Sequence, residues 1–306
     1  MNEPSLCLVA KDLCIGYAKN APIIEHVSMR LSAGTVLAVI GPNGIGKTTL
    51  FKTLTGELAP IRGSVVIEEL GKASQETAEC ESLAVKGKIF FWHHRVRDKA
   101  SVLSVRSLEP RIRARIITRV LQNEKPAWAV SVRDYIEAGL YSELGLFGKI
   151  AGKTKCRIDE AIETMDLQKL AERYVTTLSG GEFRRVVLAR ALAQDTRIVL
   201  FDEPTSDLDL SHQMDVLHLM RKLAGARKAV AFSVHDLNFA AMAADQIILL
   251  ADGKVAGFGT PSAVLTAETI ASAYGAKVLV REHPLSGLPT ILHTPDWLSE
   301  MKGKLL

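Results

Sequence analysis

A glycine-rich loop followed by a lysine and a threonine occupies residues 41–49, which read GPNGIGKTT. It fits the pattern GxxxxGK[ST] and lies between an apolar run, TVLAVI, and a helical stretch, TLFKTLTGEL. In that context the glycines let backbone N–H groups surround phosphate oxygens, Lys47 neutralises charge between β- and γ-phosphates, and the Thr48 hydroxyl helps to bind Mg²⁺. The alternative is a glycine turn that merely enters a helix. The predicted phosphate-binding residues are Gly41, Pro42, Asn43, Gly44, Gly46, Lys47, Thr48 and Thr49.

A pair of carboxylates follows a second apolar run far downstream, in RIVLFDEP. If that run is a buried strand, Asp202 emerges at the carboxyl edge of a sheet, where open α/β sheets bind ligands. Asp202 would then reach the Mg²⁺ bound beside the phosphate loop. Glu203 would orient a water molecule or accept its proton as it attacks the γ-phosphate. The alternative for such a pair is an ordinary charged surface turn.

A second loop of phosphate-site type occurs at residues 178–193, LSGGEFRRVVLARALA. A serine and two glycines leave backbone N–H groups open where an apolar pattern predicts the start of a helix. Because residues 41–49 already supply one phosphate loop, the sequence poses the question of what a second loop would bind.

The composition is that of an ordinary globular protein, and the net charge is compatible with an anionic partner. The chain has 306 residues, with 47% hydrophobic and 24% charged residues, and a formal charge of +4, which permits an anionic partner without selecting nucleic acid. The four cysteines lack CxxC spacing, which argues against a disulfide framework and a zinc site. No signal peptide and no apolar run of roughly 20 residues is found, so we expect a cytoplasmic protein.

The elements that must position these loops form an α/β pattern. Apolar runs at residues 35–44, 197–204, 228–236 and 245–253 suit strands of a parallel sheet and alternate with helical stripes. N-terminal segments such as LVAKDLCIGY and GSVVIEEL predict antiparallel strands, and residues 123–180 predict a helical subdomain within one domain of residues 1–306.

Two further segments stand apart. Residues 68–107 are predicted to form a basic, solvated insert, because charge runs usually face water; a metal site at His93 and His94 is the weaker alternative, since these neighbours lack companion ligands. Residues 266–306 form a C-terminal extension with a predicted hairpin around residues 284–287.

With the phosphate loop, LSGG and the strand ending in DE in this order, residues 6–265 resemble the ATP-binding cassette (ABC) ATPases. The resemblance implies ATP as substrate, Mg²⁺ as cofactor and four further site residues. Tyr17 is similar to the aromatic residue that stacks on adenine, and Gln122 to the glutamine that touches Mg²⁺ and the attacking water. Asp209 matches the loop that crosses the subunit interface, and His235 resembles the histidine that contacts the γ-phosphate.

The resemblance also implies an answer for the second loop. In the family, LSGG closes over ATP bound by a second copy in a head-to-tail dimer, so Ser179, Gly180 and Gly181 would bind the neighbour's γ-phosphate. Two positions depart from the usual pattern: Glu182 stands where glutamine is commoner, and Asp207 where alanine is often found. The insert before Gln122 is also longer than usual.

The terminal sequence, including HDLNFAA and GFGTPSAVLT, resembles importers of iron-siderophore complexes, haem or vitamin B12. That resemblance implies integral membrane permease subunits, indirectly an extracytoplasmic substrate-binding protein, and a peripheral position at the cytoplasmic face of the membrane. The alternatives are import of bare metal ions, export, and a nucleotide-binding module without turnover. A soluble clamp on nucleic acid is less expected, because neither two fused cassettes nor heptad-rich arms occur.

Overall fold

The computed structural model describes residues 5–70, 102–121, 124–125, 128–142, 152–206 and 208–294. The predicted Gln122, Asp207, His93 and His94 lie outside the described residues, as does most of the insert. The ends of the insert that the structure describes are regular, because one strand continues to residue 70 and another begins at residue 102. No helix in the described part is both long and apolar enough to span a membrane.

A central sheet, built from the apolar runs of the sequence, positions the site. Its strand order is β10-β9-β3-β8-β7-β6, and all neighbours except the β10–β9 pair are parallel. β3, β7 and β8 are buried along their whole length, which explains why their sequences are continuously apolar. The strands are β3 (Val36–Ile40), β6 (Ile117–Val120), β7 (Ile198–Phe201), β8 (Ala229–Ser233), β9 (Gln246–Ala251) and β10 (Lys254–Gly259).

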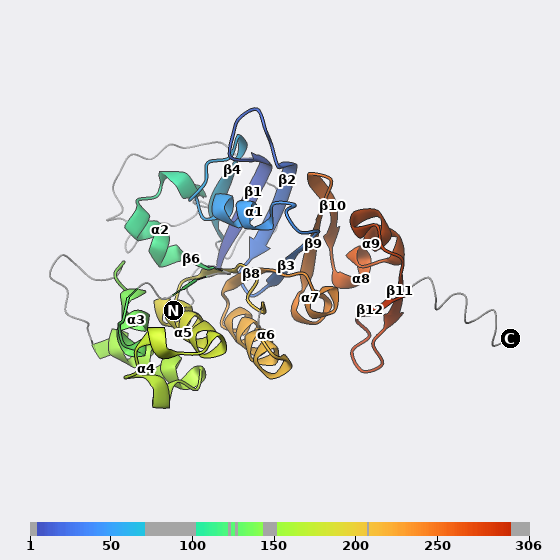
Figure 1. The fold of residues 1–306 in the computed structure, drawn as a ribbon. Coiled ribbons are helices and arrows are strands. Elements are labelled where there is room, and N and C mark those ends of the chain that lie inside the picture. The colour runs from blue at the N-terminus through green and yellow to red at the C-terminus, as the bar shows by residue number, and fades with distance from the viewer. Residues whose placement is uncertain are drawn as a thin grey trace.

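A second, antiparallel sheet has the order β2-β1-β4-β5 and lies above the central sheet in Figure 1. It comprises β1 (Ser5–Ile15), β2 (Ile24–Ser32), β4 (Arg62–Leu70) and β5 (Val102–Ser104). Helix α1 (Lys47–Leu54) lies between the two sheets, and its Leu50, Phe51 and Leu54 are fully buried in the cluster that joins them. The predicted α/β class, with a parallel core and an N-terminal antiparallel sheet, is confirmed.

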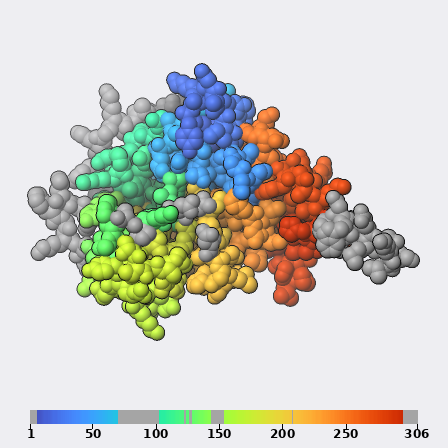
Figure 2. Space-filling view, in the orientation of Figure 1, coloured from blue at the N-terminus to red at the C-terminus, as the bar shows by residue number. Residues whose placement is uncertain are grey.

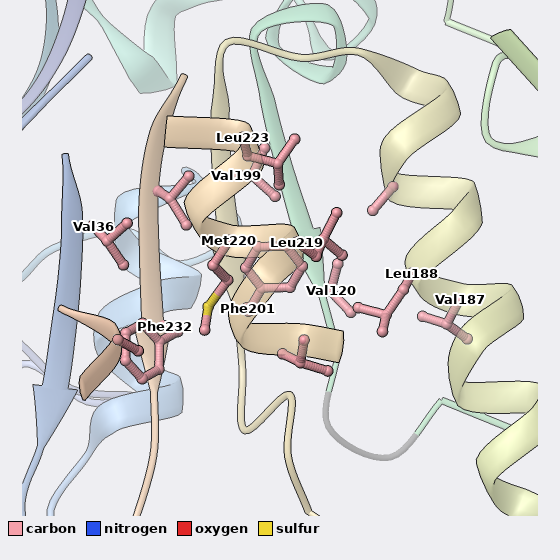
Figure 3. Packing of buried hydrophobic residues seen from close by; sticks show 14 of the residues in the cluster. Val36, Val120, Val187, Leu188, Val199, Phe201, Leu219, Met220, Leu223 and Phe232 are labelled. Carbon is pink, nitrogen blue, oxygen red and sulfur yellow. The ribbon is translucent and has the colours of Figure 1, made fainter. Parts of the chain in front are cut away.

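Helices cover the opposite face of the central sheet. Figure 3 shows Phe201 and Phe232 of the sheet facing Leu219 and Met220 of α6, with Leu188 of α5 beside them. Besides α1, the described part of the chain contains α2 (Pro110–Ile116), α3 (Val132–Ala138), α4 (Gly152–Thr164), α5 (Gly180–Gln194), α6 (Leu210–Gly225), α7 (Leu237–Ala243), α8 (Pro261–Val264) and α9 (Ala267–Tyr274), with 3₁₀ turns at Val105–Ser107, Gln168–Leu170 and Val175–Thr177.

A group of helices lies on one side of α6, and a C-terminal hairpin lies on the other (Figure 1). Helices α3, α4 and α5 gather at the lower left of Figure 1, and the space-filling view shows the same yellow-green corner projecting from the body. On the other side, β11 (Val278–Glu282) and β12 (Pro289–His293) form an antiparallel hairpin. Oδ1 of Asn238, on α7, accepts from the backbone N–H of Ile291 at 2.7 Å, and its Nδ2 donates to the carbonyl oxygen of Ile291 at 3.1 Å. These two hydrogen bonds fix the hairpin to α7.

Candidate functional site

The sheet brings three predicted segments to one edge. The phosphate loop follows β3, Asp202 and Glu203 follow β7, and His235 lies two residues after β8. Because β3, β8 and β7 are adjacent and parallel, their carboxyl ends lie side by side. Residues that are 150 or more positions apart in the sequence therefore meet at this edge.

The phosphate loop depends on glycine at two positions. Gly41 has φ of 150°, and a Cβ there would lie 2.4 Å from the carbonyl oxygen of Leu250. Gly46 has φ of 107°, and a Cβ there would lie 2.7 Å from the side chain of Ile23. Any other residue at either position would be strained and would clash. The backbone therefore curls tightly just before α1, with Asn43 and Gly44 exposed at its tip.

Lys47 is folded into this loop and is only 5% exposed. Its ammonium donates to the carbonyl oxygens of Gly41 at 2.8 Å and Pro42 at 3.2 Å, and it lies 3.3 Å from Nδ1 of His235. Burial lowers the pKa of Lys47, and the nearby carboxylates of Glu203 and Asp202 partly oppose that shift. A buried cation held mainly by neutral carbonyls is well placed to bind an anion that enters the loop.

Asp202 is the buried carboxylate of the site, with 2% exposure. Its Oδ1 accepts hydrogen bonds from Thr48 Oγ1 at 3.2 Å and from Ser233 Oγ at 2.8 Å. Oδ2 accepts no hydrogen bond from the described residues and lies 3.8 Å from Nη1 of Arg119. A hydroxyl and a carboxylate with a spare oxygen, next to a phosphate loop, form a donor set that fits Mg²⁺.

Glu203 stands in a strained turn beside His235. Its φ is 48°, in the left-handed region, and its backbone N–H donates to Ser233 Oγ at 2.9 Å. Its carboxylate Oε1 lies 2.5 Å from Nε2 of His235. Because the Lys47 ammonium can only donate, Nδ1 of His235 accepts, which places the ring proton on Nε2, where it donates to Glu203. His235 thus links the lysine of the loop to the glutamate.

Two residues that sequence reasoning missed hold this edge together. Ser233 is fully buried and bridges Asp202 to the backbone of Glu203. Arg184 of α5 is 8% exposed and donates to three carbonyl oxygens: Leu121 at 2.6 Å, Glu203 at 3.1 Å and Pro204 at 3.3 Å. The sequence contained a signal for Ser233, because this polar residue ends the apolar run KAVAFS. It contained no signal for Arg184, because the role of Arg184 arises only from tertiary contacts.

We expect Ser233→Ala to destabilise the fold. The substitution leaves the Glu203 N–H without its acceptor and removes a donor from buried Asp202, so the free energy of unfolding should fall by about 1–3 kcal/mol. Urea denaturation measures the loss. Ser262→Ala, at an exposed position on α8, is the matched control and should change stability by less than about 0.5 kcal/mol. Equal stability of the two variants would contradict the bridging role.

Tyr17 lies against α1, at one side of the phosphate loop. Tyr17 is 64% exposed, and the Lys52 ammonium lies 5.6 Å from the ring centroid and 3.3 Å from the hydroxyl oxygen. Hydrogen bonds with Thr49 and Lys52 lower the pKa of the Tyr17 hydroxyl. The exposed ring leaves a face for stacking next to the loop.

The LSGG loop is built as a helix N-terminus that faces outward. Ser179 caps α5, and its hydroxyl and backbone N–H both donate to the Glu182 carboxylate, at 2.9 and 2.7 Å. These hydrogen bonds lower the pKa of Glu182. A Cβ added at Gly180 or Gly181 would meet nothing within 4 Å. Within the described residues, no hydrogen bond or ion pair joins this loop to the phosphate loop.

Asp209 lies apart from the cluster at the sheet edge, as the exposed N-cap of α6. Its Oδ1 accepts from the backbone N–H of His212 at 2.9 Å and lies 2.7 Å from the ring Nδ1 of that residue. These contacts lower the pKa of Asp209. The structure therefore brings Lys47, Thr48, Asp202, Glu203 and His235 together, places Tyr17 beside them, and leaves Ser179, Gly180, Gly181 and Asp209 facing outward.

Comparisons with known proteins agree with this geometry. The family model described as ABC transporter matches residues 24–206. The chain is 38% identical to the hemin import ATP-binding protein HmuV of Gloeobacter violaceus over 88% of each chain. It is 33% identical to the cobalamin import ATP-binding protein BtuD of Halobacterium salinarum over 90% of this chain, but it spans only 60% of that relative's length.

A solved structure of an ABC transporter chain has the same fold as this chain. A chain of an ABC transporter described as of the metal-chelate type, in an inward-facing conformation, superposes with a TM-score of 0.72 at 25% identity. The match covers 96% of this chain and 99% of that one. The family model matches more than half of this chain, and one relative is 38% identical to it. The chain therefore belongs to the ABC transporter family.

Proposed function

We propose that this chain binds and hydrolyses ATP, as the ATP-binding subunit of an importer of metal chelates. The observation that carries the proposal is the meeting of a phosphate loop, a buried carboxylate and a Glu203–His235 pair at one sheet edge. The loop backbone and Lys47 would bind the phosphates, and Tyr17 would stack on the adenine. Thr48, Asp202 and Gln122 would hold Mg²⁺, which supplies charge neutralisation at the phosphates when bound.

Glu203 and His235 would perform the proton chemistry. The Glu203 carboxylate is 13% exposed and would orient a water molecule and accept its proton as the water attacks the γ-phosphate. His235, 45% exposed, would release Glu203 and donate from Nε2 to a γ-phosphate oxygen. The strained backbone of Glu203, fixed by Ser233, would keep the carboxylate at the sheet edge.

The outward-facing LSGG loop supports a second copy as partner. Ser179, Gly180 and Gly181 lie at a helix N-terminus, and a Cβ added at either glycine would meet no described residue within 4 Å, which suits an anion on another molecule. In a head-to-tail dimer this surface would complete the ATP site of the neighbour, with Asp209 at the interface. ATP would hold the dimer closed, and hydrolysis would open it.

The transported substrate is proposed from the relatives. Proteins named for hemin and cobalamin import, and a transporter described as of the metal-chelate type, match nearly the whole of this chain. We infer that it works with integral membrane permease subunits, and indirectly with an extracytoplasmic binding protein that delivers the chelate. The chain would then act at the cytoplasmic face of the membrane as a peripheral subunit.

A complementation experiment tests the composite site. Lys47→Ala and Ser179→Phe each damage both sites of a homogeneous dimer, whereas a mixed dimer keeps one site with both residues intact. An equal mixture should therefore recover up to about a quarter of the wild-type ATPase rate, while each variant alone stays near zero. A mixture as inactive as its components would overturn the head-to-tail site.

The transport role has its own measurement. The purified chain, combined with a chelate-importer permease in liposomes, should hydrolyse ATP several-fold faster when the permease is present and a chelate-loaded binding protein is outside. Stimulation by a bare metal ion in place of the chelate would reassign the substrate.

A further inference from the structure

Arg119 is a buried arginine that belongs to none of the predicted motifs. It lies close to Asp202, the carboxylate proposed to hold Mg²⁺. The Arg119 side chain, on β6, is 7% exposed. Its Nη2 donates to Oε2 of Glu57 at 2.8 Å, and its Nη1 lies 3.8 Å from Oδ2 of Asp202. Among the described residues, Nε and Nη1 of Arg119 have no hydrogen-bond partner. The guanidinium is thus a buried cation shared between two carboxylates and incompletely satisfied by either.

Such an arrangement costs stability. A buried guanidinium with two unpaired nitrogens loses its hydration without full replacement, and an apolar side chain at this position of β6 would avoid that cost. The neighbouring β6 residues Ile117 and Val120 are apolar and buried, which shows what the strand itself requires. An unsatisfied cation retained in such a position points to a role at the site it faces.

Glu57 connects Arg119 to the surface. A cavity of about 280 Å³, lined by Thr55, Glu57, Arg113 and Arg119 among others, opens beside α2. The Glu57 side chain is 45% exposed, and its Oε1 accepts a hydrogen bond from Thr55 at 2.8 Å. With Thr55 on one oxygen and Arg119 on the other, Glu57 is held in place at the cavity wall and partly neutralises Arg119.

The two oxygens of Asp202 have different neighbours. Oδ1 accepts from Thr48 and Ser233, whereas Oδ2 faces the Arg119 cation. In a site this buried, a positive charge 3.8 Å from a carboxylate oxygen opposes the binding of a divalent cation at that carboxylate. The closer Arg119 is drawn to Glu57, the weaker this opposition becomes.

We propose that Arg119 is a positioning residue that sets the divalent-cation affinity of Asp202, and that Glu57 at the cavity wall controls how much of its charge reaches Asp202. The inference rests on the proposed Mg²⁺-nucleotide site. Removing Arg119 strengthens cation binding, and removing the charge of Glu57 weakens it. Because the proposed action of Glu57 is to hold the Arg119 guanidinium away from Asp202 through their hydrogen bond, its loss has no effect once Arg119 is gone.

Direct metal binding tests this sign pattern. Electron paramagnetic resonance would follow Mn²⁺, as the probe for Mg²⁺, bound to the full chain in the presence of a non-hydrolysable ATP analogue. Relative to wild type, Arg119→Met should lower the half-saturating Mn²⁺ concentration by roughly three- to tenfold, and Glu57→Gln should raise it by a similar factor. The double variant should match Arg119→Met, and Arg119→Lys, which keeps the charge, should stay close to wild type.

The matched control is Arg111→Met, which removes an exposed arginine of α2 and should leave Mn²⁺ binding unchanged. A structural role alone would leave the half-saturating concentration unchanged or would shift it upward in both single variants. Either of those outcomes overturns the proposal, as does an additive double variant. Absence of nucleotide-dependent Mn²⁺ binding in the wild-type chain would instead refute the proposed ATP site, so the two failures are distinguishable.

Discussion

Glu203→Gln is expected to reduce ATP hydrolysis by about 10²–10⁴-fold while leaving ATP binding intact. The amide has nearly the shape of the carboxylate and still accepts from Nε2 of His235, but it cannot take a proton from water. Since ATP would then stay bound, the variant should accumulate as a nucleotide-bound dimer. Phosphate release measures turnover, and size-exclusion chromatography with light scattering measures the dimer.

A matched substitution separates this chemistry from a general loss of charge. Glu268→Gln lies in the first turn of α9, at an exposed position away from the sheet edge, and should hydrolyse ATP at the wild-type rate. Wild-type turnover in Glu203→Gln would remove Glu203 from the proton chemistry. Loss of ATP binding together with hydrolysis would show that Glu203 acts on the loop structure instead.

Lys47→Ala should weaken nucleotide binding itself. The ammonium is the buried cation closest to the loop carbonyls, and each charge-assisted hydrogen bond that it would make to a phosphate contributes about 1.5–3 kcal/mol. We therefore expect the dissociation constant for ATP to rise by roughly tenfold to a hundredfold. Isothermal titration calorimetry with the purified chain measures the change.

The fold should survive this substitution. Burial lowers the pKa of Lys47, so the charged form is held at a cost in the nucleotide-free chain. Removing that charge should leave the melting temperature of the nucleotide-free chain within about 3 °C of that of the wild type.

Lys52→Ala is the control. Lys52 lies in the last turn of α1, where it contacts the Tyr17 ring. The Lys52→Ala substitution should affect nucleotide binding through the base alone. It should therefore change the affinity for ATP but leave the affinity for inorganic triphosphate unchanged. Unchanged ATP affinity in Lys47→Ala would contradict the phosphate-loop assignment.

The sequence was sufficient to predict the sheet and the residues at its edge. Continuous apolar runs such as those of β3, β7 and β8 favour strands covered on both faces, and parallel strands present their carboxyl ends at one edge of the sheet. From that rule the phosphate loop, Asp202 and His235 could be expected to meet, and the structure brings Lys47 to His235 and Thr48 to Asp202. The family resemblance, which the comparisons confirm, added roles for Tyr17, Ser179 and Asp209 that stay predictions.

What the sequence could not reveal depends on contacts between distant segments. Arg184 and Arg119 look like ordinary charged residues in EFRRVV and ITRV, since neither sits in a recognisable spacing. Their importance appears only when the fold places one against three carbonyl groups and the other against two carboxylates. The capping of α6 by Asp209 and of α5 by Ser179 likewise depends on where each helix starts, which sequence patterns give only approximately.

The contacts of Arg184 have a mechanical consequence. The Arg184 guanidinium joins α5 to the backbone of Glu203 and Pro204 in the strained turn, and to Leu121 directly after β6. Separating them would break three hydrogen bonds to a buried cation, so we expect α5 and this turn to move together. We therefore expect a force applied at Ser179, the N-cap of α5, to be transmitted to the turn that carries Glu203.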